Sequence, residues 1–416
     1  MKQGGKTFTR AWFLSTAALA VGAGWASNIA GGFPRRALAH VGDPAHGGHP
    51  DALTHKMYDR FTPFRDWLSS QDVGGYLGEF MWPNNLQRGF NDERQWNQFG
   101  WSFMAWLDAT NMWASFWAID ETQLWGGFWL TPYVGKSTTN YAISAALAQA
   151  QVLEAHSTTA RYMRGFNASS AEQFEANFSN TNPGIYGKDY WYPGDTVDPD
   201  TGMNTFQYLA GLGHKMARIP FRWERIQRTL SGNLDSTELS RLKSCCAKAK
   251  AAGLYVIIDV HNNAGYYLSQ RKERRSTVAE YKIGATQLPV THFEDLWRRV
   301  SNEFKDDSNV DAYDLMNEPH VHGDIPSVGF ASPEKAWESH SQKALSAIRD
   351  TGDTKLVMVP TYANANQVPQ RHPSKWIVDP SNNHRYEAHL YFSRDGGGHY
   401  DYSYDSDNSY WQSRGY

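Results

Sequence analysis

Hydrophobic and polar positions follow two alternating patterns along most of this chain. Short apolar runs are each followed by a longer stretch in which apolar residues recur every three or four positions. The first pattern is typical of strands that are buried on both faces, and the second of helices that cover a sheet. The sequence therefore predicts repeated strand–helix units and a parallel sheet.

Eight runs are predicted to be strands: Gly75–Phe80, Met112–Ile119, Tyr162–Asn167, Met216–Ile219, Tyr255–Val260, Ala312–Met316, Lys355–Val359 and Arg385–Tyr391. Helical patterns lie at Thr62–Ser70, Glu93–Asp108, Thr139–Ala155, Thr237–Ala252, His292–Asn302 and Glu334–Arg349. No Pro/Gly/Ser-rich linker divides the chain. Eight such units without a linker favour one (β/α)8 barrel over two separate domains.

The N-terminal region has a different character. Basic residues precede an apolar run from Ala11 to about Ala26, and small residues follow it. This order is typical of a secretory signal peptide, and the run is shorter than the roughly 20 residues that span a bilayer. We therefore interpret residues 1–39 as an export signal whose cleavage site stays open, 40–55 as a flexible lead-in and 56–416 as the single barrel domain. The protein is expected to be secreted, with a retained membrane anchor as the alternative.

Charge and cysteine content exclude several classes of function. The 416 residues carry a formal net charge of −3 and no Lys/Arg-rich run, which argues against binding nucleic acid or an anionic membrane through charge. The two cysteines, Cys245 and Cys246, are adjacent, so the chain has neither a disulfide framework nor zinc-ligand spacing. We expect no metal ion and no cofactor.

The aromatic content indicates a different kind of partner. The chain has 17 Trp, 22 Tyr and 20 Phe, which together make 14% of its residues. Many of these rings fill the core, but this excess also indicates flat platforms in a cleft, and sugar rings present C–H faces that stack on such platforms. Trp125 and Trp223 are among the candidates, with core packing as the equal alternative for each.

Reactive side chains end several of the predicted strands. They are Glu79, Arg218 with Trp223 beyond it, His261 with Asn262, Asn317 with Glu318, and His389 with Tyr391. Of these, Asn262 and Trp223 are expected to contact the substrate. The active site of a (β/α)8 barrel lies at the carboxyl ends of its strands, so these side chains are expected to meet there.

Two of these residues suit glycoside cleavage. A retaining glycosidase needs two carboxyl groups about 5–5.5 Å apart, one protonated and one ionised. Glu79 and Glu318 could supply them, while Arg218 and Tyr391 could keep the nucleophile anionic and Asn317 could bind the sugar 2-hydroxyl. For either glutamate taken alone, a solvated strand-end carboxylate is the alternative.

At these residues the sequence resembles glycoside hydrolase family 5, a large family of cellulases and related retaining β-glycanases. The resemblance runs through Arg218-Ile-Pro-Phe-Arg-Trp-Glu-Arg-Ile-Gln, Asp259-Val-His-Asn, Asn317-Glu-Pro-His, Glu387-Ala-His-Leu-Tyr and Gly78-Glu-Phe. It implies that Glu318 is the acid/base and Glu79 the nucleophile. It further implies support from Arg218, His261, Asn317, His389 and Tyr391, and a sugar stacked on Trp117.

The order of the motifs departs from the family. There the nucleophile strand follows the His-x-Tyr strand, whereas here Gly78-Glu-Phe lies near the front of the chain. The resemblance thus implies a circularly permuted barrel in which the family's strands seven and eight come first. The alternative is that the first 150 residues form an unrelated domain and the barrel is broken. His261-Asn-Asn and Met81 also depart from the common pattern, which puts substrate preference in doubt.

Together these observations predict a secreted, cofactor-independent, retaining endo-β-glycanase, most simply an endo-β-1,4-glucanase, whose partner is a β-linked polysaccharide or oligosaccharide. Mannan, xylan, β-1,3-glucan and exo-acting cleavage stay open, as does a catalytically silent carbohydrate-binding barrel. We predict no nucleic-acid partner and no stable membrane insertion, and the oligomeric state is left open.

Overall fold

The structure is a computed structural model that describes residues 51–84, 89–110, 112–120, 131–135, 143–159, 162–174, 177–272 and 275–416. The export signal predicted over 1–39 and most of the lead-in lie outside these residues, as does Trp125. No helix in the described ranges combines the length and the apolar character needed to cross a bilayer.

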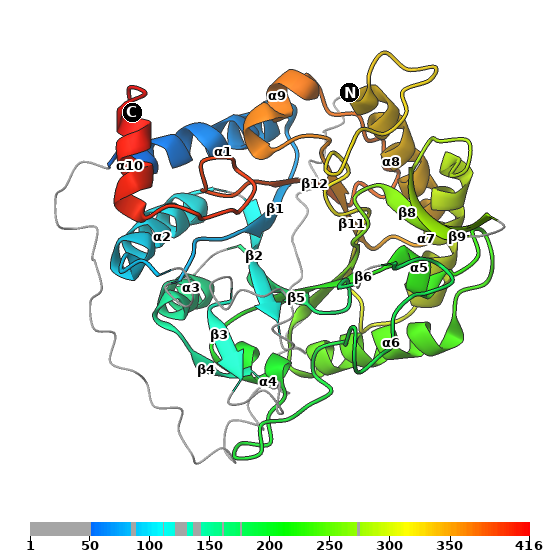
Figure 1. The fold of residues 1–416 in the computed structure, drawn as a ribbon, viewed down its shortest axis with the longest axis horizontal. Helices are drawn as coiled ribbons and strands as arrows, with labels where there is room; N and C mark the ends of the chain where they lie inside the picture. Colours follow the sequence, from blue (N-terminus) through cyan, green and yellow to red (C-terminus); the bar gives the residue numbers. More distant parts are fainter. Residues whose placement is uncertain are drawn as a thin grey trace, which may run out of the picture. The chain divides into compact units, whose positions relative to one another are not determined.

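A closed barrel of eight parallel strands forms the centre of the described chain, so the predicted fold class is confirmed (Figure 1). Around the barrel the order is β1–β12–β11–β10–β7–β6–β5–β2, and β2 pairs again with β1. Their bounds are β1 Gly75–Phe80, β2 Met112–Asp120, β5 Arg164–Ser169, β6 Met216–Phe221, β7 Tyr255–Val260, β10 Ala312–Asp314, β11 Leu356–Pro360 and β12 His384–His389. Each lies within two residues of a predicted strand at both ends.

Helices surround this barrel in Figure 1. They are α1 Ala52–Gln71, α2 Glu93–Asp108, α3 Ala148–Thr159, α4 Thr205–Gly211, α5 Trp223–Ile226, α6 Ser236–Ala251, α7 Val290–Phe304, α8 Pro333–Arg349, α9 Val368–Arg371 and α10 Tyr404–Gln412, with a 3₁₀ turn, η1, at Ala365–Gln367. Cap residues explain several of the boundaries: the side chain of Asp235 accepts from two backbone amides at the start of α6, and Ser332 precedes Pro333 at the start of α8.

Two antiparallel ribbons were not predicted. The predicted helix Thr139–Ala155 is wrong in its first part, because β4 (Ile143–Ala146) pairs with β3 (Tyr133–Gly135) before α3 begins. The second ribbon joins β8 (Gly265–Lys272) to β9 (Arg275–Lys282) after β7. Both depend on hydrogen bonds to a partner strand, which a helical spacing of apolar residues does not reveal.

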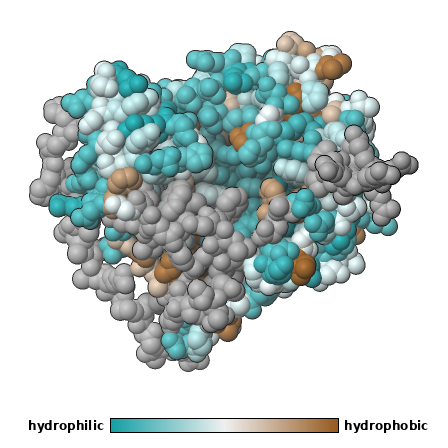
Figure 2. Space-filling view, in the orientation of Figure 1, coloured by the Kyte–Doolittle hydropathy of each residue, from teal (hydrophilic) through white to brown (hydrophobic). Residues whose placement is uncertain are grey.

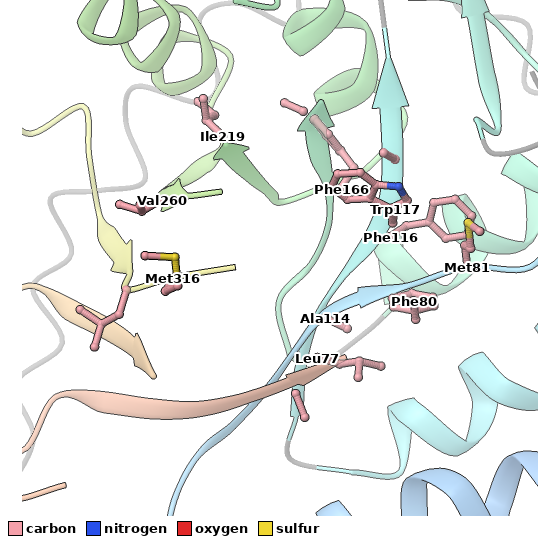
Figure 3. Close-up of a cluster of buried hydrophobic side chains, with 14 of the residues drawn as sticks. Leu77, Phe80, Met81, Ala114, Phe116, Trp117, Phe166, Ile219, Val260 and Met316 are labelled. Atoms are coloured by element: carbon pink, nitrogen blue, oxygen red, sulfur yellow. The ribbon is translucent and has the colours of Figure 1, made fainter. Parts of the chain in front are cut away.

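Aromatic side chains fill much of the core between β1, β2, β5 and the helices that cover them. Phe80 on β1 and Phe116 on β2 meet edge to face with ring centroids 5.5 Å apart, near Trp117 and Phe166 (Figure 3). The surface differs: the described part of the face in Figure 2 is largely hydrophilic, with only scattered apolar residues. Most of the aromatic excess therefore serves packing.

The first and last described helices, α1 and α10, lie side by side outside the barrel (Figure 1). The buried Arg60 of α1 donates to the carbonyl oxygens of Tyr391 (3.0 Å), Ser393 (2.7 Å) and Arg394 (2.9 Å), which follow β12. Its guanidinium also lies over the ring of Trp411 in α10. One side chain thus joins parts of the chain more than 300 residues apart.

Replacing Arg60 with Ala is expected to lower the free energy of unfolding by about 3 kcal/mol or more, because buried carbonyl oxygens lose their donors. Arg60→Lys keeps a cation and is expected to cost less. Guanidinium unfolding of both variants measures the difference. A loss below about 1 kcal/mol for Arg60→Ala would contradict this role.

Candidate active site

The carboxyl ends of the barrel strands bring together most of the predicted site residues. Glu79 is the second-last residue of β1, Arg218 lies in β6, Asn317 and Glu318 follow β10, and His389 ends β12. All but Glu318 are at most 4% exposed, and the Glu318 side chain is 19% exposed. The site is therefore a largely buried polar cluster that opens at one carboxyl group.

Arg218 is the hub of this cluster. Its Nη1 donates to Glu79 Oε1 (3.0 Å), its Nε to Asp314 Oδ2 (2.7 Å) and its Nη2 to Asn317 Oδ1 (3.0 Å). Nη2 also lies 3.2 Å from Asp259 Oδ2 and 3.7 Å from Glu387 Oε1. Because the guanidinium is a rigid fork, these contacts fix the relative positions of five strands.

A local irregularity in β1 aims Glu79 at the other site residues. Leu77 pairs with Ala388, but Glu79 pairs with His389, so Gly78 is an extra residue in the register. Only glycine fits there, because a Cβ at Gly78 would lie 1.7 Å from Glu387 Oε1 and 2.5 Å from His389 Nε2. Glu79 Oε2 accepts a hydrogen bond from the Tyr391 hydroxyl.

Glu318 faces Glu79 across His389. The His389 Nδ1 lies 3.1 Å from Glu318 Oε1 and 3.5 Å from Glu79 Oε2. Carboxylate oxygens of the two glutamates and this nitrogen all lie within 4.8 Å of one another. Glu318 has a φ of 39°, a left-handed backbone that costs free energy and is common at functional sites. An oxygen of Glu79 and an oxygen of Glu318 thus lie at most 4.8 Å apart.

The ionisation of the three groups is linked. Burial raises the pKa of Glu79, although the nearby cations His389 and Arg218 oppose this. Burial also raises the pKa of Glu318, but the hydrogen bond and charge of His389 outweigh it and lower the pKa of Glu318 to about 2. Burial lowers the pKa of His389, and the carboxylates around it raise it well above its usual value. These directions favour a protonated His389 beside an ionised Glu318.

His261 and Trp117 form one wall of the site. Their rings stack with centroids 5.4 Å apart and an interplanar angle of 19°. His261 Nδ1 hydrogen-bonds to Asp259 Oδ2 (2.8 Å), and burial lowers the pKa of His261 to about 4, so the ring is neutral. Trp117 is 9% exposed, which leaves part of its ring open to a ligand.

Two predicted substrate contacts do not fit the structure. Trp223 is 0% exposed and packs against Tyr266 and Phe293, so its ring has no face for a sugar. Asn262 is 1% exposed, donates to both carboxylate oxygens of Glu224 and accepts from the Trp223 amide. Both residues support the loops after β6 and β7.

Four buried site residues were missed: Asn167, Asp259, Asp314 and Glu387. Asn167 Oδ1 accepts from Arg218 Nη1 (2.9 Å), and its Nδ2 donates to the carbonyl oxygen of Gly78 (2.9 Å). Glu387 is fully buried, and its Oε1 lies 2.8 Å from His389 Nε2. Side chains two residues apart on a strand face the same side, so Glu387, His389 and Tyr391 could have been grouped by that spacing.

Glu79, Glu318 and His389 are also the one group of acids and histidines, among the residues that the structure places, whose side chains approach as closely as the ligands of a metal ion. Hydrogen bonds already join them to each other and to Tyr391, Arg218 and Glu387. We therefore interpret them as groups that exchange protons.

A protein-family model described as cellulase (glycosyl hydrolase family 5) matches residues 169–415. The match includes Arg218, Glu318 and His389. Glu79 and Trp117, on β1 and β2, precede it.

The chain is also similar to individual proteins. It is 28% identical to the manganese dependent endoglucanase Eg5A of Phanerodontia chrysosporium over 43% of this chain, and the match spans 41% of that relative's length. It is 27% identical to endo-β-1,4-glucanase B of Emericella nidulans over 56% of this chain and 62% of that relative. The crystal structure of an endo-β-1,4-glucanase from Xanthomonas axonopodis pv. citri has 32% identity and a TM-score of 0.43, with 59% of this chain and 72% of that chain covered.

Adding a methyl group at Gly78 tests whether the two strands must approach this closely. Gly78→Ala is expected to lower the free energy of unfolding by about 2–3 kcal/mol, because the new Cβ collides with buried side chains. Gly74→Ala is the control, since the nearest atom there is the flexible end of Arg385 at 2.8 Å, and its cost is expected below about 1 kcal/mol. Equal costs in denaturant unfolding would contradict the tight fit.

Proposed function

Because the chain belongs to glycosyl hydrolase family 5, we propose that it hydrolyses β-glycosidic bonds with net retention of configuration, and that Glu79 and Glu318 perform the chemistry. The observation that carries this proposal is the pair of carboxylates at facing strand ends, with oxygens within 4.8 Å of a shared His389 nitrogen. The proposed partner is a β-linked polysaccharide or oligosaccharide.

The first step forms a bond between Glu79 and the anomeric carbon while the bond to the leaving oxygen breaks. Arg218 and the Tyr391 hydroxyl both contact Glu79, and they favour its anionic form until it attacks. Glu318, the more exposed of the pair, gives a proton to the departing oxygen. The contacts support this division of roles, because Glu79 is the one of the pair that touches a permanent cation, Arg218.

The second step reverses the first with water. Glu318, now ionised, takes a proton from water, whose oxygen bonds to the anomeric carbon as the bond to Glu79 breaks. Asn317 offers an amide whose oxygen is held by Arg218, so its nitrogen is the half that would donate to the sugar 2-hydroxyl. Trp117 would stack beneath the sugar at the cleavage point, beside the neutral ring of His261.

The most economical substrate is a β-1,4-glucan cleaved internally. Two of the similar proteins carry the name endo-β-1,4-glucanase, and the aromatic wall of Trp117 suits a sugar ring with equatorial substituents. Mannan, xylan or β-1,3-glucan cleavage and exo action use the same carboxylates, so a substrate panel separates them. The N-terminal apolar leader supports secretion as part of this proposal.

We also propose that the chain is a circular permutant of the family's usual order. The family model matches from the end of β5 to residue 415, while β1 and β2 supply Glu79 and Trp117 and close the barrel between β12 and β5. The helices at the two ends of the described chain touch: Leu53 donates to Asn408 (3.1 Å) and Lys56 to the Tyr416 hydroxyl (2.7 Å). A chain that joined these ends and opened before β5 would keep every strand pair.

Removing either carboxyl group is expected to stop hydrolysis. Glu79→Ala and Glu318→Ala should each lower kcat on a soluble β-glucan about a thousandfold or more. Glu303→Ala is the control: this exposed glutamate of α7 forms an ion pair with Lys243, and its loss should change kcat little. Initial rates on cellulosic glucan, mannan and xylan, with the product anomer followed by NMR, identify the substrate and the stereochemistry.

Azide distinguishes the two roles. It should rescue both variants, giving the α-glycosyl azide with Glu79→Ala and the β-glycosyl azide with Glu318→Ala, because only the second still forms the glycosyl-enzyme. Near-normal hydrolysis by Glu79→Ala would overturn the nucleophile assignment. Binding of oligosaccharide without any hydrolysis by the native chain would favour a silent carbohydrate-binding barrel.

A rearranged chain tests the permutation. It begins at Tyr162, runs to Tyr416, continues through about eight Gly/Ser residues into Asp51 and ends at Thr159; such a linker spans roughly 15 Å. We expect it to fold and to keep kcat/KM within about tenfold of the native value, since no barrel contact changes. The control chain is opened inside α8, which interrupts a helix, and is expected not to fold. A rearranged chain that fails to fold while the α8 control folds would contradict the proposal.

A further inference from the structure

A chain of two hydrogen bonds joins the proposed acid/base to a third carboxyl group deeper in the barrel. His389 Nδ1 lies 3.1 Å from Glu318 Oε1, and His389 Nε2 lies 2.8 Å from Glu387 Oε1. The imidazole is 4% exposed, so neither nitrogen faces open solvent. This is the geometry through which an imidazole passes a proton from one side to the other.

The chemistry of Glu318 creates a need for such a chain. A general acid must carry a proton when substrate arrives, yet His389 holds the pKa of Glu318 at about 2 against the effect of burial. The pKa of Glu387 is raised, chiefly by burial, and that of His389 is raised by Glu79, Glu318 and Glu387. The proton that Glu318 lacks is therefore one or two hydrogen bonds away.

The surroundings of Glu387 favour its holding a proton. It is 0% exposed, and the charged or titratable groups around it are Arg218 from β6, Asp314 from β10, Tyr76 from β1 and His389 from its own strand. Arg218 stays 3.7 Å away and bonds more closely to Asp314 and Glu79. Glu387 Oε2 has no hydrogen-bond partner within the described part of the chain, and a buried unbonded oxygen costs less on a neutral carboxyl than on an ionised one.

We propose that Glu387 and His389 together store the proton for catalysis and exchange it with Glu318 through His389 Nδ1. This inference rests on the proposed function, in which Glu318 is the acid/base. Glu387 touches no reacting atom, so it acts as a positioning residue through His389.

The proton balance closes over one turnover. In the first step the Nδ1 proton of His389 passes to Glu318 and from there to the departing sugar oxygen, and the remaining ring proton stays at Nε2 against Glu387. In the second step Glu318 takes a proton from water and returns it to Nδ1 as the hydroxyl oxygen bonds to the anomeric carbon. No other donor is consumed.

Glu387→Gln tests the proposal, because the amide keeps the size and a hydrogen bond but cannot store an exchangeable proton. On a cello-oligosaccharide, whose leaving group must be protonated, we expect kcat/KM to fall about 10- to 100-fold with little change in KM. On a 2,4-dinitrophenyl β-cellobioside, whose leaving group needs no proton, we expect kcat/KM within about threefold of the native value.

The pH profile gives a second readout. Without the carboxyl of Glu387, His389 loses its proton more readily, so the proton that His389 passes to Glu318 is lost from the site at a lower pH. The optimum for cello-oligosaccharide is therefore expected to move at least one unit toward acid, and the loss to shrink as the pH falls. Asp314→Asn is the matched control: it removes another buried carboxyl bonded to Arg218 that has no contact with His389, and it should affect both substrates alike.

A Glu387→Gln variant that loses activity equally on both substrates, with an unmoved pH optimum, would show a structural role only and overturn the proposal. Unchanged activity on both substrates would overturn it as well. Failure of the proposed function looks different, because Glu318→Ala would then show no dependence on the leaving group. Should Glu387→Gln not fold, the NMR titration of His389 in the native protein decides: a pKa near 6.5 would also overturn the proposal.

Discussion

The barrel interior depends on one buried cation, the guanidinium of Arg218. Four carboxylates lie within 3.7 Å of it, and none is more than 3% exposed. Such a cluster is costly to bury unless its charges are paired, because each ion has left water. Asp314, Asp259 and Glu387 each keep an oxygen without a partner in the described chain, so pairing is incomplete. Burial raises the pKa of Asp259 and that of Glu387. The site's protonation is thus a property of the barrel core.

The strands could be predicted from sequence because they are buried on both faces. Runs such as Tyr255–Val260 are almost uniformly apolar and match the structure residue for residue. The ribbons β3–β4 and β8–β9 could not be predicted, because what fixes them is a cross-strand partner rather than a local pattern. Ile143–Ala146 carries apolar and small residues that suit a helix equally well.

The candidate site was predictable only in part, for a related reason. In a (β/α)8 barrel the residues at the carboxyl ends of the strands lie on one face, and this rule predicted that Glu79, Arg218, Glu318 and His389 meet there. Their hydrogen bonds join them on that face. It does not say whether a side chain points into the cleft or back into the loop. The Asn262 amide turns inward and donates to the buried carboxylate of Glu224, and the Trp223 ring turns inward to pack against Tyr266. Burial and pairing decide that orientation, and neither is a property of one strand.

The geometry of the site also depends on the place where β1 and β12, from opposite ends of the described chain, lie side by side. Tyr391 and Glu79 are 312 residues apart, yet the hydroxyl of one bonds the carboxylate of the other. Glu79 lies in β1, and Tyr391 follows β12 by two residues. The backbone ladder holds these two strands together, and Arg60 donates to the carbonyl oxygen of Tyr391 itself. The entropy of closing so long a loop rises only slowly with its length, so a few buried contacts suffice to hold the junction. The contacts that close the barrel therefore also position the proposed nucleophile. Removing the Arg60 side chain should shift Tyr391 and, through its hydroxyl, the carboxylate of Glu79.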